Sequence, residues 1–219
     1  MKLKDRSRQW KEYSKMSDLG IIARRKFFNN AFDGALTCAG IVSGIFIIFL
    51  SNSSTFESQD VLITGFATAL AIGISGLWGA FLSEEAERKK KVMDMKKEMA
   101  DVEDESKIVV LKHIKNKYKK GEKKKPKSIL EKAERFATIV ASLVDGGAPV
   151  LGSSLPLVPF FFGTLNVLHF IFSYAILAGL LVYLGIFLGQ ISGGGRLRYA
   201  LHLITAGVVT LIVSILLGI

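Results

Sequence analysis

Two aspartates, Asp33 and Asp145, lie within otherwise apolar stretches of this 219-residue chain. A carboxylate inside a membrane-spanning helix costs about 3 kcal/mol, so it usually faces a protein interior or a wet cavity where it has a partner. The apolar stretches that hold the two aspartates contain no Lys or Arg. We therefore expect a mobile cation or a proton as the partner, which makes both candidate metal ligands. The alternative for Asp33 is a position at the membrane edge, capped by Asn29 or Asn30.

Further carboxylates gather around the charged segment between the second and third apolar stretches. Carboxylates three or four residues apart project from one helix face, and pairs of such helices can build an oxygen-lined cation site. Ordinary surface ion pairs use the same spacings, because this segment also holds eighteen Lys and Arg residues. The candidate ligands are Glu84, Glu85, Glu87, Glu98, Asp101, Glu105, Glu131 and Glu134.

Other side chains that could do chemistry give weaker signals. His169, His202 and the single cysteine, Cys38, stand apart from one another in the sequence, and packing explains each better than metal binding. The sequence has no HExxH, GxSxG or P-loop motif. We expect no enzymatic activity and no tightly bound cofactor.

The elements that must position these residues are membrane helices. Half of the chain is apolar although its net charge is +10, because the apolar and charged residues occupy different stretches. A membrane span needs roughly 20 apolar residues. The sequence therefore predicts an all-α polytopic membrane protein with five spans, at about Phe27–Leu50, Val61–Ser83, Phe136–Phe162, Leu165–Ile191 and Tyr199–Gly218. The first 26 residues lack the apolar core of a cleavable signal peptide.

Basic residues predict the orientation of these spans. Nine of the 29 Lys and Arg residues lie in residues 1–26, eighteen in 84–135 and two in the turn with Arg196 and Arg198. With five spans, all three segments fall on one side, which the positive-inside rule assigns to the cytoplasm. The N-terminus is thus expected inside and the C-terminus on the opposite side.

The chain then divides into four segments. Residues 1–26 form a basic N-terminal segment, 27–83 the first two spans, 84–135 a charged helical insert and 136–219 the last three spans. Within the insert, apolar residues at helical spacing continue the second span, and a second helix is expected around Leu111, Ile114 and Tyr118. Ser128 and Glu131 resemble a capping box that starts the helix of the third span. The insert's basic charge favours anionic lipid headgroups over nucleic acid as a partner.

A faint internal repeat links the two aspartates. Asp33-Gly34 and Asp145-Gly146 each lie a few turns in from the cytoplasmic end of an otherwise apolar span. This pattern hints at a duplicated helix pair, as found in many transporters.

Taken together, these stretches resemble the vacuolar iron transporter family over about residues 27–219. The motifs are Phe32-Asp33-Gly34-Ala35-Leu36-Thr37 with the following Ala39-Gly40-Ile41-Val42-Ser43-Gly44, then Ser83-Glu84-Glu85-Ala86-Glu87, and Pro156-Leu157-Val158-Pro159-Phe160. The resemblance implies a homodimer that exports Fe²⁺ or Mn²⁺ from the cytoplasm by proton antiport. The family's membrane aspartate matches Asp33, and its cytoplasmic acidic residues match loosely the eight carboxylates named above.

Three functions remain open from the sequence. The first is a divalent metal transporter in the plasma membrane or a vacuole-like membrane, with metal ions and protons as its partners. The second is a non-transporting membrane scaffold or lipid-binding protein of the same fold. The third is a transporter for another solute, in which the aspartates carry protons alone.

Overall fold

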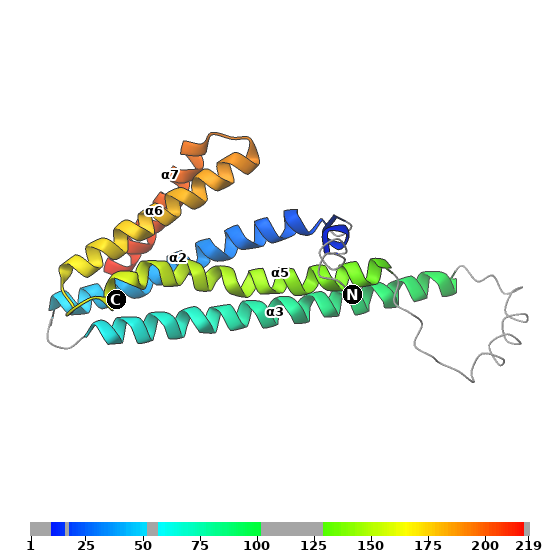
Figure 1. The fold of residues 1–219 in the computed structure, drawn as a ribbon, viewed down its shortest axis with the longest axis horizontal. Helices are drawn as coiled ribbons and strands as arrows, with labels where there is room; N and C mark the ends of the chain where they lie inside the picture. Colours follow the sequence, from blue (N-terminus) through cyan, green and yellow to red (C-terminus); the bar gives the residue numbers. More distant parts are fainter. Residues whose placement is uncertain (1–9, 16–17, 52–56, 102–128, 217–219) are drawn as a thin grey trace, which may run out of the picture. The chain divides into compact units, whose positions relative to one another are not determined.

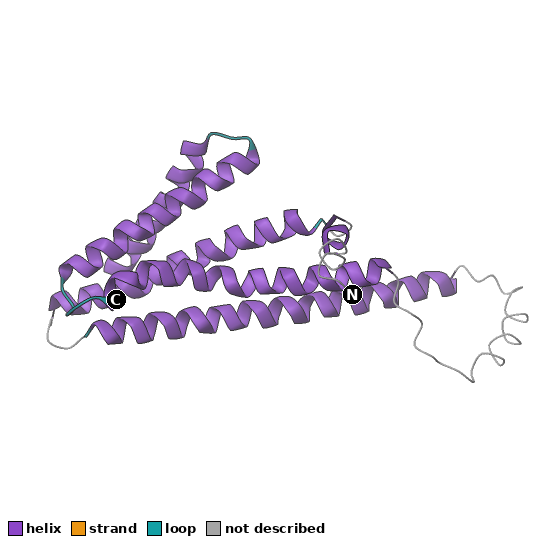
Figure 2. Ribbon diagram, viewed as in Figure 1, coloured by secondary structure: helices purple, strands orange, loops and turns teal. Residues whose placement is uncertain are grey.

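The structure, a computed structural model, describes residues 10–15, 18–51, 57–101 and 129–216 (Figure 1). Regular structure in these ranges is helical throughout (Figure 2), which confirms the predicted all-α class. A short helix covers residues 10–15. The longer elements are α2 (Leu19–Ser51), α3 (Ser58–Asp101), α5 (Ile129–Ser154), the 3₁₀ helix η2 (Leu155–Phe161), α6 (Val167–Ser192) and α7 (Arg196–Leu216).

Five of these helical segments are long and apolar enough to cross a membrane, which confirms the five predicted spans. They are Leu19–Ser51, Ser58–Glu87, Lys132–Phe161, Val167–Ser192 and Arg196–Leu216. The largest difference from the prediction is at the first span, because α2 begins at Leu19 rather than near Phe27. Three basic residues, Arg24, Arg25 and Lys26, therefore belong to this helix.

The described residues form two compact units. The first comprises the described residues up to Asp18 and those between Gly79 and Ile139, and the second comprises those between Leu19 and Trp78 and from Val140 onward. In the first unit, the rings of Trp10 and Tyr13 each lie 6.0 Å from the ring of Phe136. The predicted helix around Leu111 and the proposed cap Ser128 lie outside the described residues.

Helix α2 forms the core of the second unit. Its small residues Ala31, Ala35 and Ala39 are buried against leucines of α6 and α7. Farther along α2, Cys38, Val42, Ile45 and Phe49 pack with Val61, Leu157, Phe160 and Phe170. Small side chains let helix backbones approach closely, which stabilises membrane helices where lipid removes most of the hydrophobic driving force.

Glycines mark the closest helix contacts of this unit. A Cβ at Gly34 would overlap the backbone of Pro149 in α5, and one at Gly152 would overlap the backbone of Ala31 in α2. Gly185 and Gly189 of α6 likewise face the backbone of α7 at Ala200 and Arg196. Gly185 and Gly189 are four residues apart, a spacing of small residues that is typical of closely packed membrane helices.

Adjacent glycines of α5 give a first test of this packing. A Cβ at Gly146 would lie 2.5 Å from the carbonyl oxygen of Gly73 and 2.6 Å from the Cβ of Leu77, both in α3. We expect Gly146→Ala to destabilise the protein by about 1–3 kcal/mol, because a backbone neighbour cannot move aside alone. Thermal unfolding in detergent measures the effect.

The matched control is Gly147→Ala, since a Cβ there meets nothing within 4 Å. This substitution should be neutral, or should stabilise by up to about 1 kcal/mol through the higher helix propensity of alanine. Equal losses of stability from the two substitutions would contradict the close α3–α5 contact.

Candidate functional site

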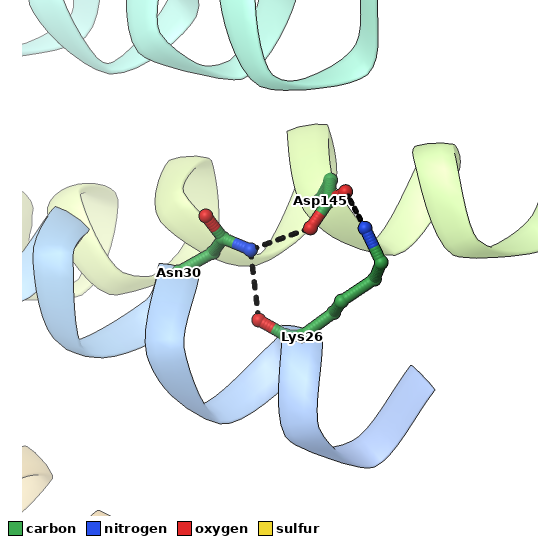
Figure 3. A network of polar contacts seen from close by, with 3 residues as sticks. All are labelled: Lys26, Asn30 and Asp145. Atoms are coloured by element: carbon green, nitrogen blue, oxygen red, sulfur yellow. Dashed lines mark hydrogen bonds and ion pairs between the residues drawn. The ribbon is translucent and has the colours of Figure 1, made fainter. Parts of the chain in front are cut away.

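The clearest polar cluster between two of the membrane-crossing helices joins α2 and α5 around Asp145 (Figure 3). The Lys26 ammonium forms an ion pair with Oδ2 of Asp145. The Asn30 side-chain amide donates to Oδ1 of Asp145 at 2.7 Å and to the backbone carbonyl of Lys26 at 2.9 Å. Lys26 and Asn30 are one helical turn apart, so both reach the same carboxylate. Asp145 itself is 8% exposed.

This arrangement corrects one expectation for Asp145. The sequence predicted an aspartate without a basic partner, to be neutralised by a mobile cation or a proton. In the structure the positive charge comes from Lys26 of the same chain. The prediction was wrong because the apolar stretch appeared to begin after Lys26, whereas the helix continues back to Leu19. The role of Asp145 as a metal ligand stays a prediction.

The backbone at Asp145 is also unusual. Pro149 lies inside α5 and has no N–H, so the carbonyl of Asp145, four residues earlier, lacks its ordinary helix donor. Gly76 of α3 packs against this carbonyl, since a Cβ on Gly76 would lie 2.8 Å from the oxygen. Asp145 thus presents both a carboxylate and a carbonyl oxygen released from the helix ladder.

Asp33 has a different environment. It lies on the exposed face of α2, although its neighbour Gly34 is buried against α5. Its backbone carbonyl accepts a hydrogen bond from the Thr37 hydroxyl at 2.8 Å. Within the residues that the structure describes, no hydrogen bond or ion pair involves the Asp33 carboxylate. The capping by Asn29 or Asn30 that was the alternative for Asp33 is thus not seen, and Asn30 contacts Asp145 instead.

The two Asp-Gly pairs of the apparent repeat are therefore alike at their glycines and different at their aspartates. Gly34 and Gly146 each lie against the backbone of a neighbouring helix. Their aspartates differ, because Asp145 is buried and ion-paired while Asp33 is exposed.

The predicted carboxylates of the insert belong to the first unit. Glu84, Glu85 and Glu87 lie in α3, and Glu85 forms an ion pair with Lys89 at 3.0 Å. Glu134 is exposed in α5. Glu98 and Asp101 lie in α3 and Glu131 lies in α5, but their side chains are outside the described part, as is the whole of Glu105. Among the described residues, no three His, Cys, Asp or Glu side chains gather as a metal site would require.

Two residues that sequence reasoning set aside turn out to have structural roles. His169 is buried at the start of α6, where its Nδ1 faces the Asn166 backbone N–H in a capping box. Cys38 is buried in the apolar core. Sequence reasoning missed Lys26 and Asn30 as partners of Asp145. Their spacing of four residues places both on one face of α2, but no signal in the sequence linked that face to Asp145.

Comparison with known proteins gives two matches. The chain is 27% identical over 168 residues to the uncharacterized protein MJ0645 of Methanocaldococcus jannaschii, a match that covers 77% of this chain and 74% of that protein. The model of the VIT family matches residues 25–219, a range that includes α2 from Arg25 onward and every later helix. The matched range includes Lys26, Asp33 and Asp145. The chain therefore belongs to the VIT family, the vacuolar iron transporter family.

Proposed function

We propose that this protein exports Fe²⁺ or Mn²⁺ from the cytoplasm across a plasma or vacuole-like membrane, in exchange for protons and as a homodimer. Membership of the VIT family indicates transport of metal ions across a membrane. The observation that carries the finer proposal is the exposed carboxylate of Asp33 on an apolar helix that is long enough to span a membrane.

Contact between lipid and the Asp33 carboxylate is energetically unfavourable. A carboxylate at the centre of a membrane span costs about 3 kcal/mol, so the exposed face of α2 needs a protein or aqueous neighbour. A second copy of the chain provides one, and its own Asp33 adds a second carboxylate. Two carboxylates that share one site repel each other, and a divalent cation between them relieves the repulsion.

Carboxylates also explain the exchange for protons. A carboxylate must be deprotonated to bind a metal ion, so proton binding and metal binding compete at Asp33. A proton gradient directed toward the cytoplasm then favours metal release on the far side. The carboxylates of the insert, from Glu84 to Glu134, would gather metal ions near the cytoplasmic end of the pathway.

Uptake by proteoliposomes tests the proposal. Purified protein is reconstituted, and Mn²⁺ uptake is measured with and without a pH gradient against protein-free liposomes. We expect uptake that rises when the metal-releasing side is acidic, and that excess Fe²⁺ inhibits. Absence of Mn²⁺ and Fe²⁺ uptake under both gradients would refute metal transport, and uptake indifferent to pH would refute antiport.

The basic charge of the insert favours a second candidate, a scaffold that binds anionic lipids. Residues 84–135 hold eighteen Lys and Arg residues, and each contributes about 1 kcal/mol near an anionic surface. This candidate predicts that the chain binds anionic lipid vesicles and that Mn²⁺ leaves its melting temperature unchanged. A rise in melting temperature with Mn²⁺ concentration would favour the transporter.

A further inference from the structure

The ion pair between Lys26 and Asp145 has no part in the function proposed above. Its ammonium lies on one carboxylate oxygen of Asp145, and the Asn30 amide nitrogen lies on the other (Figure 3). The same amide nitrogen also contacts the Lys26 carbonyl oxygen, at 2.9 Å. The chain itself thus supplies the positive charge and the donors that a bound cation would otherwise replace.

The groups that would remain without the ammonium suit a divalent cation. Asp145 offers two carboxylate oxygens, and the Asn30 side-chain amide lies against one of them. A half-turn of the Asn30 amide would exchange its nitrogen for its oxygen, which adds a third oxygen beside the carboxylate. Hard divalent cations prefer carboxylate, carbonyl and amide oxygens of this kind.

The Lys26 ammonium is also able to move away from Asp145. It is a point charge on a flexible four-carbon stem, and Asp145 is its one partner among the described residues. The side chain of Lys26 is 23% exposed and that of Asp145 is 11% exposed, so Lys26 lies nearer the surface of the unit than Asp145 does. A long lysine side chain can turn its charge toward water while its stem stays on the apolar surface.

We propose that Lys26 is a tethered cation that occupies a divalent-metal site built on Asp145, and that an arriving metal ion displaces it. The choice of a divalent metal as the displacing ion rests on the proposed function. Displacement gives the site a resting state without an unpaired buried charge. It also lowers the apparent metal affinity. Only the protein molecules whose Lys26 has left Asp145 can bind metal, and the affinity falls in proportion to their fraction.

A permanent structural clamp is the competing explanation of the same ion pair. Both explanations predict that Lys26→Met destabilises the metal-free protein, because the buried Asp145 charge loses its partner. They differ in the response to metal. If metal displaces Lys26, removal of the lysine should open a tighter Mn²⁺ site on Asp145. If the ion pair is a permanent structural clamp, its removal should create no new site.

The experiment measures Mn²⁺ binding to the purified full chain in detergent, by the shift of the melting temperature with Mn²⁺ concentration. Wild type is compared with Lys26→Met, Lys26→Arg, Asp145→Asn and the double variant Lys26→Met/Asp145→Asn. The Asp145→Asn background identifies Mn²⁺ bound elsewhere, such as on the insert. For Lys26→Met we expect a gain in Asp145-dependent affinity of about tenfold or more, which the double variant loses.

Lys26→Arg keeps the charge and tests displacement without opening the site. A guanidinium can hold a carboxylate through two hydrogen bonds, so it should be harder to displace. We expect its Asp145-dependent Mn²⁺ affinity to fall severalfold below that of wild type. If Lys26→Met yields no folded protein, the comparison of wild type with Lys26→Arg tests the proposal by itself. Equal Mn²⁺ affinities of these two proteins overturn the proposal.

Failure of this inference is distinct from failure of the proposed function. Equal Mn²⁺ affinities in wild type, Lys26→Met and Lys26→Arg, together with Mn²⁺ uptake by wild-type proteoliposomes, would refute the tethered cation and leave metal transport standing. Tighter Mn²⁺ binding by Lys26→Met without uptake by wild type would support the site and refute transport.

Discussion

Replacing Asp33 with asparagine is expected to abolish Mn²⁺ uptake by proteoliposomes while leaving the melting temperature of the purified protein unchanged or slightly raised. The substitution keeps the shape of the side chain and removes its charge. Asp33 is exposed on α2, and its carboxylate has no described partner that the folded chain would lose. Transport depends on that charge because a neutral amide cannot hold a divalent cation against water as a carboxylate does. We expect a loss of uptake of at least about 100-fold, which corresponds to about 2.7 kcal/mol.

Two controls sharpen this prediction. Asp94→Asn makes the same change at an exposed aspartate of α3 that is no candidate ligand, and it should leave uptake intact. Asp33→Glu keeps the charge and should retain part of the uptake. Normal transport by Asp33→Asn would remove Asp33 from the mechanism, and a large fall in its melting temperature would assign the residue a structural role instead.

Replacing Gly34 with alanine is expected to destabilise the protein more strongly than Gly146→Ala does. The added Cβ would overlap the carbonyl oxygen, Cα and carbonyl carbon of Pro149. Gly152 makes the reciprocal contact with the backbone of Ala31, so α2 and α5 touch at two points. The Ser153 hydroxyl also lies 3.0 Å from the Gly34 carbonyl oxygen at this crossing. Separating the helices would loosen all of these contacts, at a cost of at least about 3 kcal/mol.

Thermal unfolding in detergent measures this loss, with Gly179→Ala as the matched control. A Cβ at Gly179 of α6 meets nothing within 4 Å. Alanine there should stabilise by up to about 1 kcal/mol, because glycine is the poorer helix former. The idea of a close α2–α5 crossing fails if Gly34→Ala melts at or above the temperature of wild type.

Hydropathy was enough to predict the five membrane-crossing helices of this protein. Apolar and charged residues are segregated along the chain, so each span stands out by length and composition, and all five are confirmed. The helix around Asp145 was also predicted, since Asp145 lies within α5, whereas the proposed cap at Ser128 lies outside the described residues. Within the predicted bounds of the spans, Asp33 and Asp145 are the two acidic residues, and the composition identified both.

The environment of each aspartate was beyond the reach of the sequence. Which face of α2 is covered depends on how α5, α6 and α7 pack, and periodicity along α2 alone does not reveal it. The start of α2 was misjudged for a related reason. Residues 19–26 mix apolar and basic side chains, and their place in the helix becomes clear only once the contact of Lys26 with Asp145 is known.

The early start of α2 has a practical consequence for anyone shortening this protein. A chain cut at Phe27, where the apolar stretch begins, would keep every membrane-crossing stretch that hydropathy recognises. It would nevertheless lose the ammonium that neutralises Asp145, and leave a buried negative charge on α5. The minimal membrane domain should therefore begin no later than Leu19, the first residue of the helix that carries Lys26.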